Sequence, residues 1–110
     1  MKLSLHRADD FNSDFRRQYN WYLEDASENV AKGFREAVEN TLQLLLTHPD
    51  LGRQRKFRNP TLAHIRSFRV ESPFRNLSIF YRHDGKELSV ERLMHGARDL
   101  PRRLAEPPNS

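Results

Sequence analysis

The hydrophobic residues of this chain change their spacing midway, and that change constrains the fold more than any other feature of the sequence. Between residues 11 and 46, apolar side chains recur every three or four positions, which is the spacing of amphipathic helices. Between residues 65 and 94, they alternate with polar residues, which is typical of strands. Pro49 lies between the two regions, and proline does not continue a helix. Helices followed by strands predict an α+β protein.

A short strand and a first helix are predicted at the start of the chain. Apolar and polar residues alternate over about residues 2–6, which favours a strand. Asp9 and Asp10 then offer a helix N-cap, and the helix is predicted to end near Leu23. Trp21 lies off the apolar face of this helix. That face carries four aromatic residues, at the spacing of one helical stripe: Phe11, Phe15, Tyr19 and Tyr22.

A second helix follows after a very short connection. Asp25 and Glu28 have the spacing of a capping box, with Asp25 as the cap, and Pro49 ends the helix. Its apolar stripe consists of Val30, Phe34, Val38, Leu42 and Leu45. Two helices joined this closely form an antiparallel αα-hairpin. We expect the hairpin to pack on the sheet through Phe11, Phe15, Tyr19, Val30, Phe34, Val38 and Leu45.

Three strands are predicted in the second half, after a turn at residues 50–52 and a basic loop that runs to Pro60. They are Ile65–Val70, Leu77–Arg82 and Leu88–Met94, and the Asp84-Gly85 pair is a strong hairpin signal between the last two. A last helical turn starting at Pro101 is expected to carry Leu100 and Leu104 onto the core. The predicted order is β-α-α-β-β-β with a short C-terminal turn, and the αα-hairpin packs on a mostly antiparallel sheet.

The predicted domain covers residues 1–104, and residues 105–110 are predicted to form a flexible tail. Phe80 and Tyr81 are neighbours on the middle strand, so they face opposite sides of the sheet. We expect one of the two to lie in the core and the other to lie on the face away from the helices, where a partner can reach it.

The composition excludes several classes of protein. The chain has no cysteine, which excludes disulfides, thiol catalysis and cysteine-ligated zinc. His6, His48 and His83 are scattered without metal-ligand spacing, so no metal and no cofactor are predicted. The longest aliphatic run is three leucines at residues 44–46, too short for a membrane span, and the N-terminus has no secretory signal. A cytoplasmic protein is therefore expected.

The charge is distributed unevenly along the chain. Residues 1–50 carry six Lys and Arg and nine Asp and Glu, whereas residues 51–110 carry thirteen Lys and Arg and six Asp and Glu. Residues 51–70 hold six basic residues and no acidic one. A basic patch of this kind is typical of a surface that binds a polyanion. The sequence leaves open a nucleic acid, an acidic protein partner, or a solvated basic face.

Four local strings, in this order of elements, resemble the ParE branch of the RelE/ParE toxin superfamily over about residues 3–104. They are HPDLGR at 48–53, IRSFRV at 65–70, IFYR at 79–82 and LMHGARDL at 93–100. The resemblance implies the toxin half of a type II toxin–antitoxin, or plasmid stabilisation, module. Such toxins are held inactive by a cognate antitoxin, which has a DNA-binding part and a C-terminal segment that wraps the toxin.

The resemblance also implies two alternative activities. RelE-like members cleave mRNA on the ribosome without a metal, whereas ParE-like members poison DNA gyrase and are not known to catalyse a reaction. RNA cleavage without a metal needs a base and an acid. RelE-like enzymes use a C-terminal Tyr or His, or a glutamate near the second strand. The last tyrosine here is Tyr81, residues 51–70 contain no acid, and residues 97–110 contain no Tyr or His. The sequence therefore favours a gyrase inhibitor that is not itself an enzyme.

Two further interpretations stay open: a ribosome-dependent mRNA endonuclease, and a degenerate homologue that binds its antitoxin without being toxic. An endonuclease site would consist of His64, His95, Arg66 and Arg82. Otherwise His64 is an exposed histidine at a loop end, and the ring of His95 binds the turn at Gly96-Ala97 or Asp99.

The sequence also predicts two binding surfaces. The target-binding residues are expected to be basic: Arg53, Arg55, Lys56, Arg58, Arg66, Arg82 and Arg98. For Arg98 the alternative is a local salt bridge with Asp99. The expected antitoxin is acidic and amphipathic in its C-terminal segment, and it supplies most of the contact with DNA. Aromatic residues of the first helix are expected to bind it: Tyr19, Trp21 and Tyr22.

Overall fold

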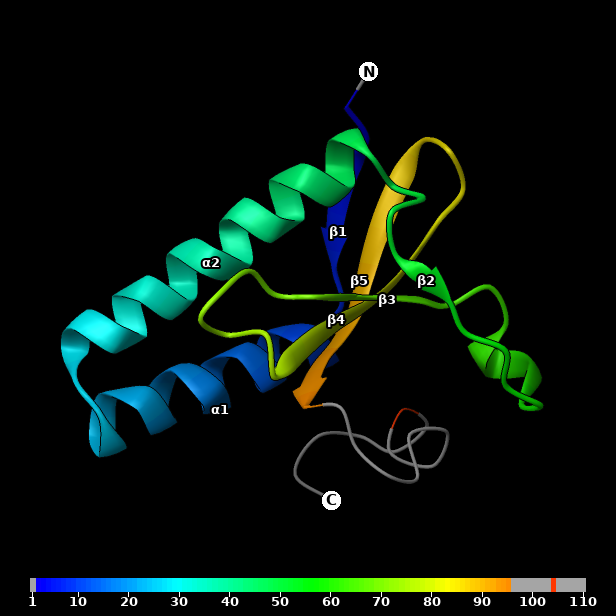
Figure 1. The fold of residues 1–110 in the computed structure, drawn as a ribbon. Helices are drawn as coiled ribbons and strands as arrows, with labels where there is room; N and C mark the ends of the chain where they lie inside the picture. The colour runs from blue at the N-terminus through cyan, green and yellow to red at the C-terminus, as the bar shows by residue number, and fades with distance from the viewer. Residues whose placement is uncertain (1, 96–103, 105–110) are drawn as a thin grey trace.

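A five-stranded mixed sheet with two helices packed on one face forms the fold (Figure 1). The computed structural model describes residues 2–95 and residue 104. Its elements are β1 (Ser4–Arg7), α1 (Asp9–Asp25), α2 (Glu28–Thr47), β2 (Arg53–Gln54), a 3-10 turn η1 (Pro60–Leu62), β3 (Arg66–Arg69), β4 (Leu77–His83) and β5 (Glu87–His95). The predicted order of helices and long strands is confirmed. Strand β2 is an addition within the predicted basic loop, and turn η1 is an addition at the end of that loop.

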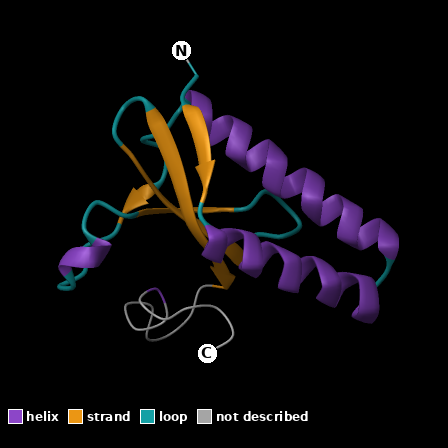
Figure 2. Ribbon diagram, turned by 180° about the vertical axis from the view of Figure 1, so that it is seen from behind, coloured by secondary structure: helices purple, strands orange, loops and turns teal. Residues whose placement is uncertain are grey.

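The strand order is β1-β5-β4-β3-β2, so the first and last strands of the chain are neighbours. Strands β3, β4 and β5 form an antiparallel meander, in agreement with the predicted mostly antiparallel sheet, and β1 pairs in parallel with β5. Leu5 of β1 lies opposite Leu88 of β5. Helices α1 and α2 run as an antiparallel hairpin along the same side of the sheet (Figure 2).

The main core lies between the αα-hairpin and the sheet. Phe11, Phe34, Val38 and Leu45 are fully buried there, and Phe15 and Tyr19 are packed against them at the edge. The prediction for Val30 is wrong, because 37% of this residue is exposed. Val30 lies in the first turn of α2, at the tip of the hairpin, where the sheet no longer covers it (Figure 1).

The helix caps differ from the prediction at both N-termini. Helix α1 begins at Asp9 after Ala8, which makes no side-chain cap, so both aspartates lie within the first turn. Their carboxylates stabilise the positive end of the helix dipole there. Ser27, not Asp25, caps α2, because α1 continues as far as Asp25. The Ser27 hydroxyl oxygen accepts a 3.1 Å hydrogen bond from the backbone N–H of Val30.

A second apolar cluster covers the sheet face away from the helices. It consists of Leu62, Ile65, Phe80, Met94 and Leu104, with Phe57 packed against it. The expectation that Phe80 or Tyr81 would lie on an open face is therefore wrong, since both are buried. Turn η1 and the loop before it fold over Phe80. Leu104 is buried as predicted, whereas Leu100 lies outside the described residues.

The β4–β5 hairpin turns at Asp84 and Gly85, as predicted. Gly85 has a φ of +87°, which favours glycine. The Asp84 carboxylate accepts hydrogen bonds from the backbone N–H groups of Lys86 and Glu87, at 2.9 and 2.8 Å. These bonds lower the pKa of Asp84, with that from Glu87 making the largest contribution. None of the described helices is long and apolar enough to cross a membrane.

Candidate functional site

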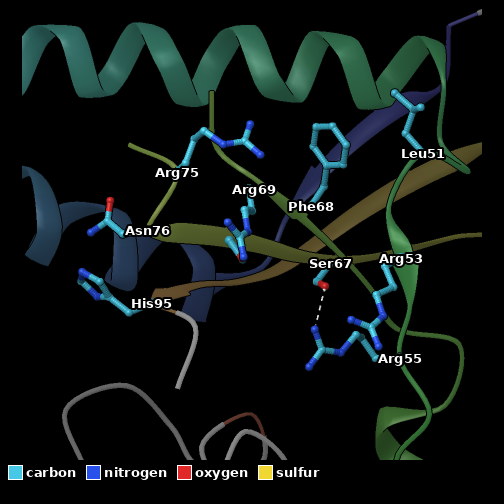
Figure 3. A pocket seen from close by; sticks show the side chains of 10 residues that line it. Leu51, Arg53, Arg55, Ser67, Phe68, Arg69, Arg75, Asn76 and His95 are labelled. Atoms are coloured by element: carbon cyan, nitrogen blue, oxygen red, sulfur yellow. Dashed lines mark hydrogen bonds between the residues drawn. The ribbon is translucent and has the colours of Figure 1, made fainter. Parts of the chain in front are cut away.

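A groove of about 700 Å³ runs along the edge of β3 and across the sheet face away from the helices (Figure 3). We call it the arginine groove, because four arginines line it. Its lining residues are Leu51, Arg53, Arg55, Ser67, Phe68, Arg69, Arg75, Asn76, Ser78 and His95. This set contains four permanent positive charges and one imidazole, and it contains no carboxylate.

The groove exists because β2 is very short. Strand β2 pairs with β3 only at Ser67 and Arg66, which leaves the edge of β3 open at Phe68 and Arg69. Arg69 lies opposite Ser78, and Ser67 lies opposite Phe80, so Ser67 and Arg69 share the sheet face away from the helices. The β3–β4 connection adds Arg75 and Asn76, and the end of β5 adds His95.

The positive charge of the groove is not neutralised by described carboxylates. Within residues 2–95 and 104, no ion pair involves Arg53, Arg55, Arg69 or Arg75. The Arg55 guanidinium donates a 3.3 Å hydrogen bond to the Ser67 hydroxyl, which holds one arginine across the groove (Figure 3). Guanidinium groups free of ion pairs favour an anionic occupant.

A second pocket of about 320 Å³ continues from the arginine groove. Arg17, Gln18, Trp21 and Tyr22 of α1 line it together with Asn76 and His95, which also line the groove. The Trp21 side chain is 53% exposed. Its ring packs against Tyr22 with a centroid distance of 5.2 Å and an angle of 66° between the planes. We call this second cavity the Trp21 pocket.

Among the predicted antitoxin-binding residues, only Trp21 is exposed. Tyr22 is 9% exposed and packs against Phe34 and Phe74 of the core. Burial raises the pKa of the Tyr22 phenol. Tyr19 is half-buried, and the Arg35 guanidinium lies 4.7 Å above the centre of its ring. Arg35 therefore covers part of the Tyr19 surface.

Arg66, predicted as a target-binding and endonuclease residue, holds the turn that follows α2. Its guanidinium donates to the carbonyl oxygens of Asp50 and Gly52, at 3.3 and 2.9 Å, and forms a 3.4 Å ion pair with the Asp50 carboxylate. The same carboxylate contacts the Nε2 of His83 at 2.7 Å. Arg66 lies on the opposite face of β3 from Arg69, so the arginine groove does not include it.

Arg82, the other arginine of the predicted endonuclease set, attaches turn η1 to the sheet. It donates to the carbonyl oxygens of Thr61 and Ala63, at 2.6 and 2.8 Å, and it forms a 3.2 Å ion pair with Glu91. These contacts engage all three of its nitrogen atoms. Arg82 lines a different cavity, near Leu62 and Arg92.

The remaining predicted residues are dispersed. Lys56 and Arg58 are exposed on the loop after β2 and do not line the groove. His64 is exposed, with a φ of +64°, after η1. His95 alone among the four predicted endonuclease residues lines the groove. Arg98 lies outside the described residues, as do the expected turn partners of His95.

Sequence reasoning missed Arg69, Arg75 and Asn76 as groove residues. Arg69 belongs to the predicted strand at residues 65–70, but the face of the sheet on which it lies depends on how that strand pairs with β4. Arg75 and Asn76 belong to the connection between β3 and β4, where no periodicity marks them. Within the described residues, no group of three or more His, Cys, Asp or Glu side chains could hold a metal ion.

Solved structures with the same fold are found among toxin–antitoxin proteins. A chain of the chromosomal ParDE TA system from P. aeruginosa has a TM-score of 0.68 at 19% identity, over 86% of this chain and 96% of that one. A mutant of E. coli toxin RelE in the free state has a TM-score of 0.61 at 14% identity, over 96% of this chain and 95% of that one. A chain of the toxin–antitoxin complex RelBE2 from Mycobacterium tuberculosis has a TM-score of 0.59 at 15% identity, over 86% and 99%.

The sequence itself matches one family model. A comparison with curated proteins finds no significant match. The model that matches, over residues 5–100, is described as the ParE toxin of the type II toxin–antitoxin system parDE. That range includes both helices, all the strands except the first residue of β1, and every residue of the arginine groove. The chain therefore belongs to the ParE toxin family of type II toxin–antitoxin systems.

Proposed function

We propose that this protein is a toxin that inhibits DNA gyrase and that a cognate antitoxin neutralises it. The observation that carries the proposal is the arginine groove, which is open, lined by four arginines and free of carboxylates. Family membership supports the toxin class. The proposed site of action is the cytoplasm, where gyrase and DNA are found, and stabilisation of a plasmid is one biological role consistent with it.

The proposed antitoxin segment is acidic and amphipathic, and it occupies the arginine groove. Leu51 is 48% exposed and Phe68 is half-buried, so they offer apolar contacts beside Arg53 and Arg69. Acidic side chains of the segment would pair with the arginines. Apolar anchors set the residence time of such a complex, and charge complementarity raises its association rate. Contact with operator DNA is assigned to the antitoxin.

Ribosome-dependent mRNA cleavage remains a second candidate, because one observation favours it. His95 lies in the arginine groove, where an imidazole could transfer a proton beside cations that stabilise a phosphorane. General acid–base cleavage needs a second proton-transfer group. Among the described groove residues, His95 is the one histidine, and His64 lies elsewhere. A binding role for the groove therefore has more support.

Induction of the toxin in cells tests the choice between the two targets. Gyrase inhibition should cause an SOS response and accumulate cleaved DNA, and purified gyrase should show the same DNA cleavage with the purified toxin. Immediate arrest of translation with cut mRNA would instead support the endonuclease. Growth without either effect would support a degenerate homologue. His95→Ala and His64→Ala should each leave toxicity largely intact if the variants melt like the wild type.

Association rates test the antitoxin assignment. Replacing Arg53, Arg55 and Arg69 by Gln removes three charges inside the groove. This variant should bind the antitoxin more slowly, with a weaker salt dependence of the rate, because electrostatic steering is lost. Replacing Lys56, Arg58 and Lys86 by Gln removes the same charge outside the groove and serves as the matched control. Equal rates and salt slopes for the two variants would remove the groove from the antitoxin interface.

A further inference from the structure

The arginine groove and the Trp21 pocket form one continuous surface, because Asn76 and His95 line both. We propose that this surface binds single-stranded nucleic acid, with a base stacked on Trp21 and the following phosphates on the groove arginines. This inference goes beyond gyrase inhibition, since it gives the toxin a nucleic-acid contact of its own. It also predicts that an acidic antitoxin segment and a nucleic acid compete for the groove.

The Trp21 pocket has the side chains that a nucleobase needs. Trp21 is 53% exposed, although its neighbour Tyr22 holds it edge to face at 5.2 Å. An exposed indole supported by a buried ring is a rigid platform for stacking, and stacking on aromatic rings is a main source of affinity for single strands. Gln18 and Asn76 line the same pocket and offer amide donors and acceptors for the edge of a base.

The adjoining groove has the charges that a phosphate backbone needs. Arg69 and Arg75 line the groove with Asn76 and His95, and Arg53 and Arg55 line it further along. Within the described part of the chain, none of these arginines is engaged in an ion pair. Guanidinium groups bind phosphate oxygens through paired hydrogen bonds. An acidic peptide would also use these charges, but it has no planar base for the Trp21 pocket.

A single strand fits this arrangement better than a duplex. Bases of a duplex are paired and stacked on one another, so their faces are not available to Trp21. The pocket and groove together measure roughly 1,000 Å³, from the two volumes of about 320 and 700 Å³. This space accommodates a few nucleotides, at the lower end of the site sizes known for single-strand-binding domains.

Trp21 itself provides the measurement, because it is the single tryptophan of the chain. Oligothymidylate and oligouridylate of about twelve nucleotides would be titrated against the full-length protein, with the tryptophan fluorescence of the wild type and the anisotropy of a dye-labelled strand as readouts. The anisotropy of the labelled strand also measures binding by the variants that lack Trp21. We expect both strands to quench Trp21 and to bind with a strong salt dependence. A difference between them would identify DNA or RNA as the preferred strand.

Variants separate stacking from charge. Trp21→Ala should weaken binding by about 5- to 100-fold, whereas Trp21→Phe, which keeps an aromatic ring, should weaken it less. Arg69→Gln and Arg75→Gln should each lower the salt slope by about 0.7, the value for one phosphate contact on a single strand. Lys86→Gln, at the opposite end of β5 from His95, is the matched control and should change neither quantity.

Three outcomes would overturn the proposal. They are no binding of either strand at low salt, binding that Trp21→Ala leaves unchanged, and equal quenching by an oligoglutamate peptide of similar length. The last outcome would assign the surface to a protein partner only. Thermal melting of every variant excludes unfolding as the cause. Because these titrations contain neither gyrase nor antitoxin, their failure is distinguishable from failure of the proposed function.

Discussion

The backbone N–H of Gly52 donates a 2.8 Å hydrogen bond to the hydroxyl oxygen of Tyr81, which lies on β4. The same hydroxyl donates to the carbonyl oxygen of Pro49 at 2.7 Å. Tyr81 is fully buried, so one phenol fixes the turn between α2 and β2 against β4. This turn positions Leu51 and Arg53, which line the arginine groove.

Gly52→Ala should destabilise the protein by about 1–3 kcal/mol, the usual cost of overpacking a filled site. A Cβ atom at this position would lie 2.6 Å from Cε1 of the Tyr81 ring, and that ring is fully buried. Gly33→Ala is the matched control, because a Cβ there meets nothing within 4 Å in the interior of α2. The control should gain about 0.5–1 kcal/mol from better helix propensity. Urea unfolding of both variants measures the difference, and equal shifts would contradict the packing described for Gly52.

Tyr81→Phe should lower the free energy of unfolding by about 1–3 kcal/mol, because it leaves the buried N–H of Gly52 without its acceptor. The variant should also change the response to alkaline pH. Burial raises the pKa of the Tyr81 phenol above its ordinary value of 10.0. A phenol whose pKa is higher in the folded state than in the unfolded state contributes its full stabilisation at pH values below its unfolded-state pKa. This contribution is lost as the pH rises through the folded-state pKa.

Unfolding free energies measured between pH 8 and about pH 11 test this response. Above about pH 10, stability should fall more steeply in the wild type than in Tyr81→Phe. The pKa of Tyr22 is also raised, but Tyr22 is present in both proteins, so it does not contribute to the difference between their pH profiles. Parallel pH profiles would show that Tyr81 titrates alike in the folded and unfolded states.

Phe34→Ala should cost about 3–5 kcal/mol of stability, which is the range for removing a buried phenylalanine ring. Phe34 is 0% exposed, and its ring lies 5.2 Å from that of Phe15 and 5.6 Å from that of Phe74. Domains have only about 5–15 kcal/mol in total, so this variant should fold poorly. Val30→Ala, at an exposed site of the same helix, should cost less than about 1 kcal/mol. Thermal melting compares the two, and similar midpoints would contradict the assignment of the core face of α2.

Asp14→Ala should destabilise the protein by about 3–5 kcal/mol, because it removes the carboxylate that pairs with a buried arginine. The Asp14 carboxylate accepts from the Nε of Arg92 at 2.7 Å and from the backbone N–H of Leu93 at 3.0 Å, and so joins α1 to β5. Glu39→Ala is the control and should cost less than about 1 kcal/mol, because the side chains of the Arg7–Glu39 pair are 34% and 42% exposed. Denaturant titration compares the two, and a small effect of Asp14→Ala would mean that water replaces the lost contact.

The candidate site was only partly predictable from the sequence. Charge counting located the basic region, and Arg53 and Arg55 do line the groove. Arg66 and Arg69 are three positions apart, so a strand places them on opposite sides, but the sequence does not show which side is open. Arg66 holds a turn and Arg69 lines the groove. The place of Trp21 off the apolar stripe left open whether it faces a partner or the second helix, and the structure leaves it 53% exposed. The burial of Tyr22 follows from contacts with Phe34 and Phe74.

The sequence by itself determined the helices, the long strands, their order and the β4–β5 hairpin, because these depend on hydrophobic periods and turn residues that are local in the chain. Only the tertiary structure decided that β1 lies in parallel beside β5, that η1 covers Phe80, and that the short β2 leaves β3 open at Arg69. These features depend on contacts between residues distant in sequence, and a strand carries no local signal for its neighbour or its register. The groove is one product of that pairing.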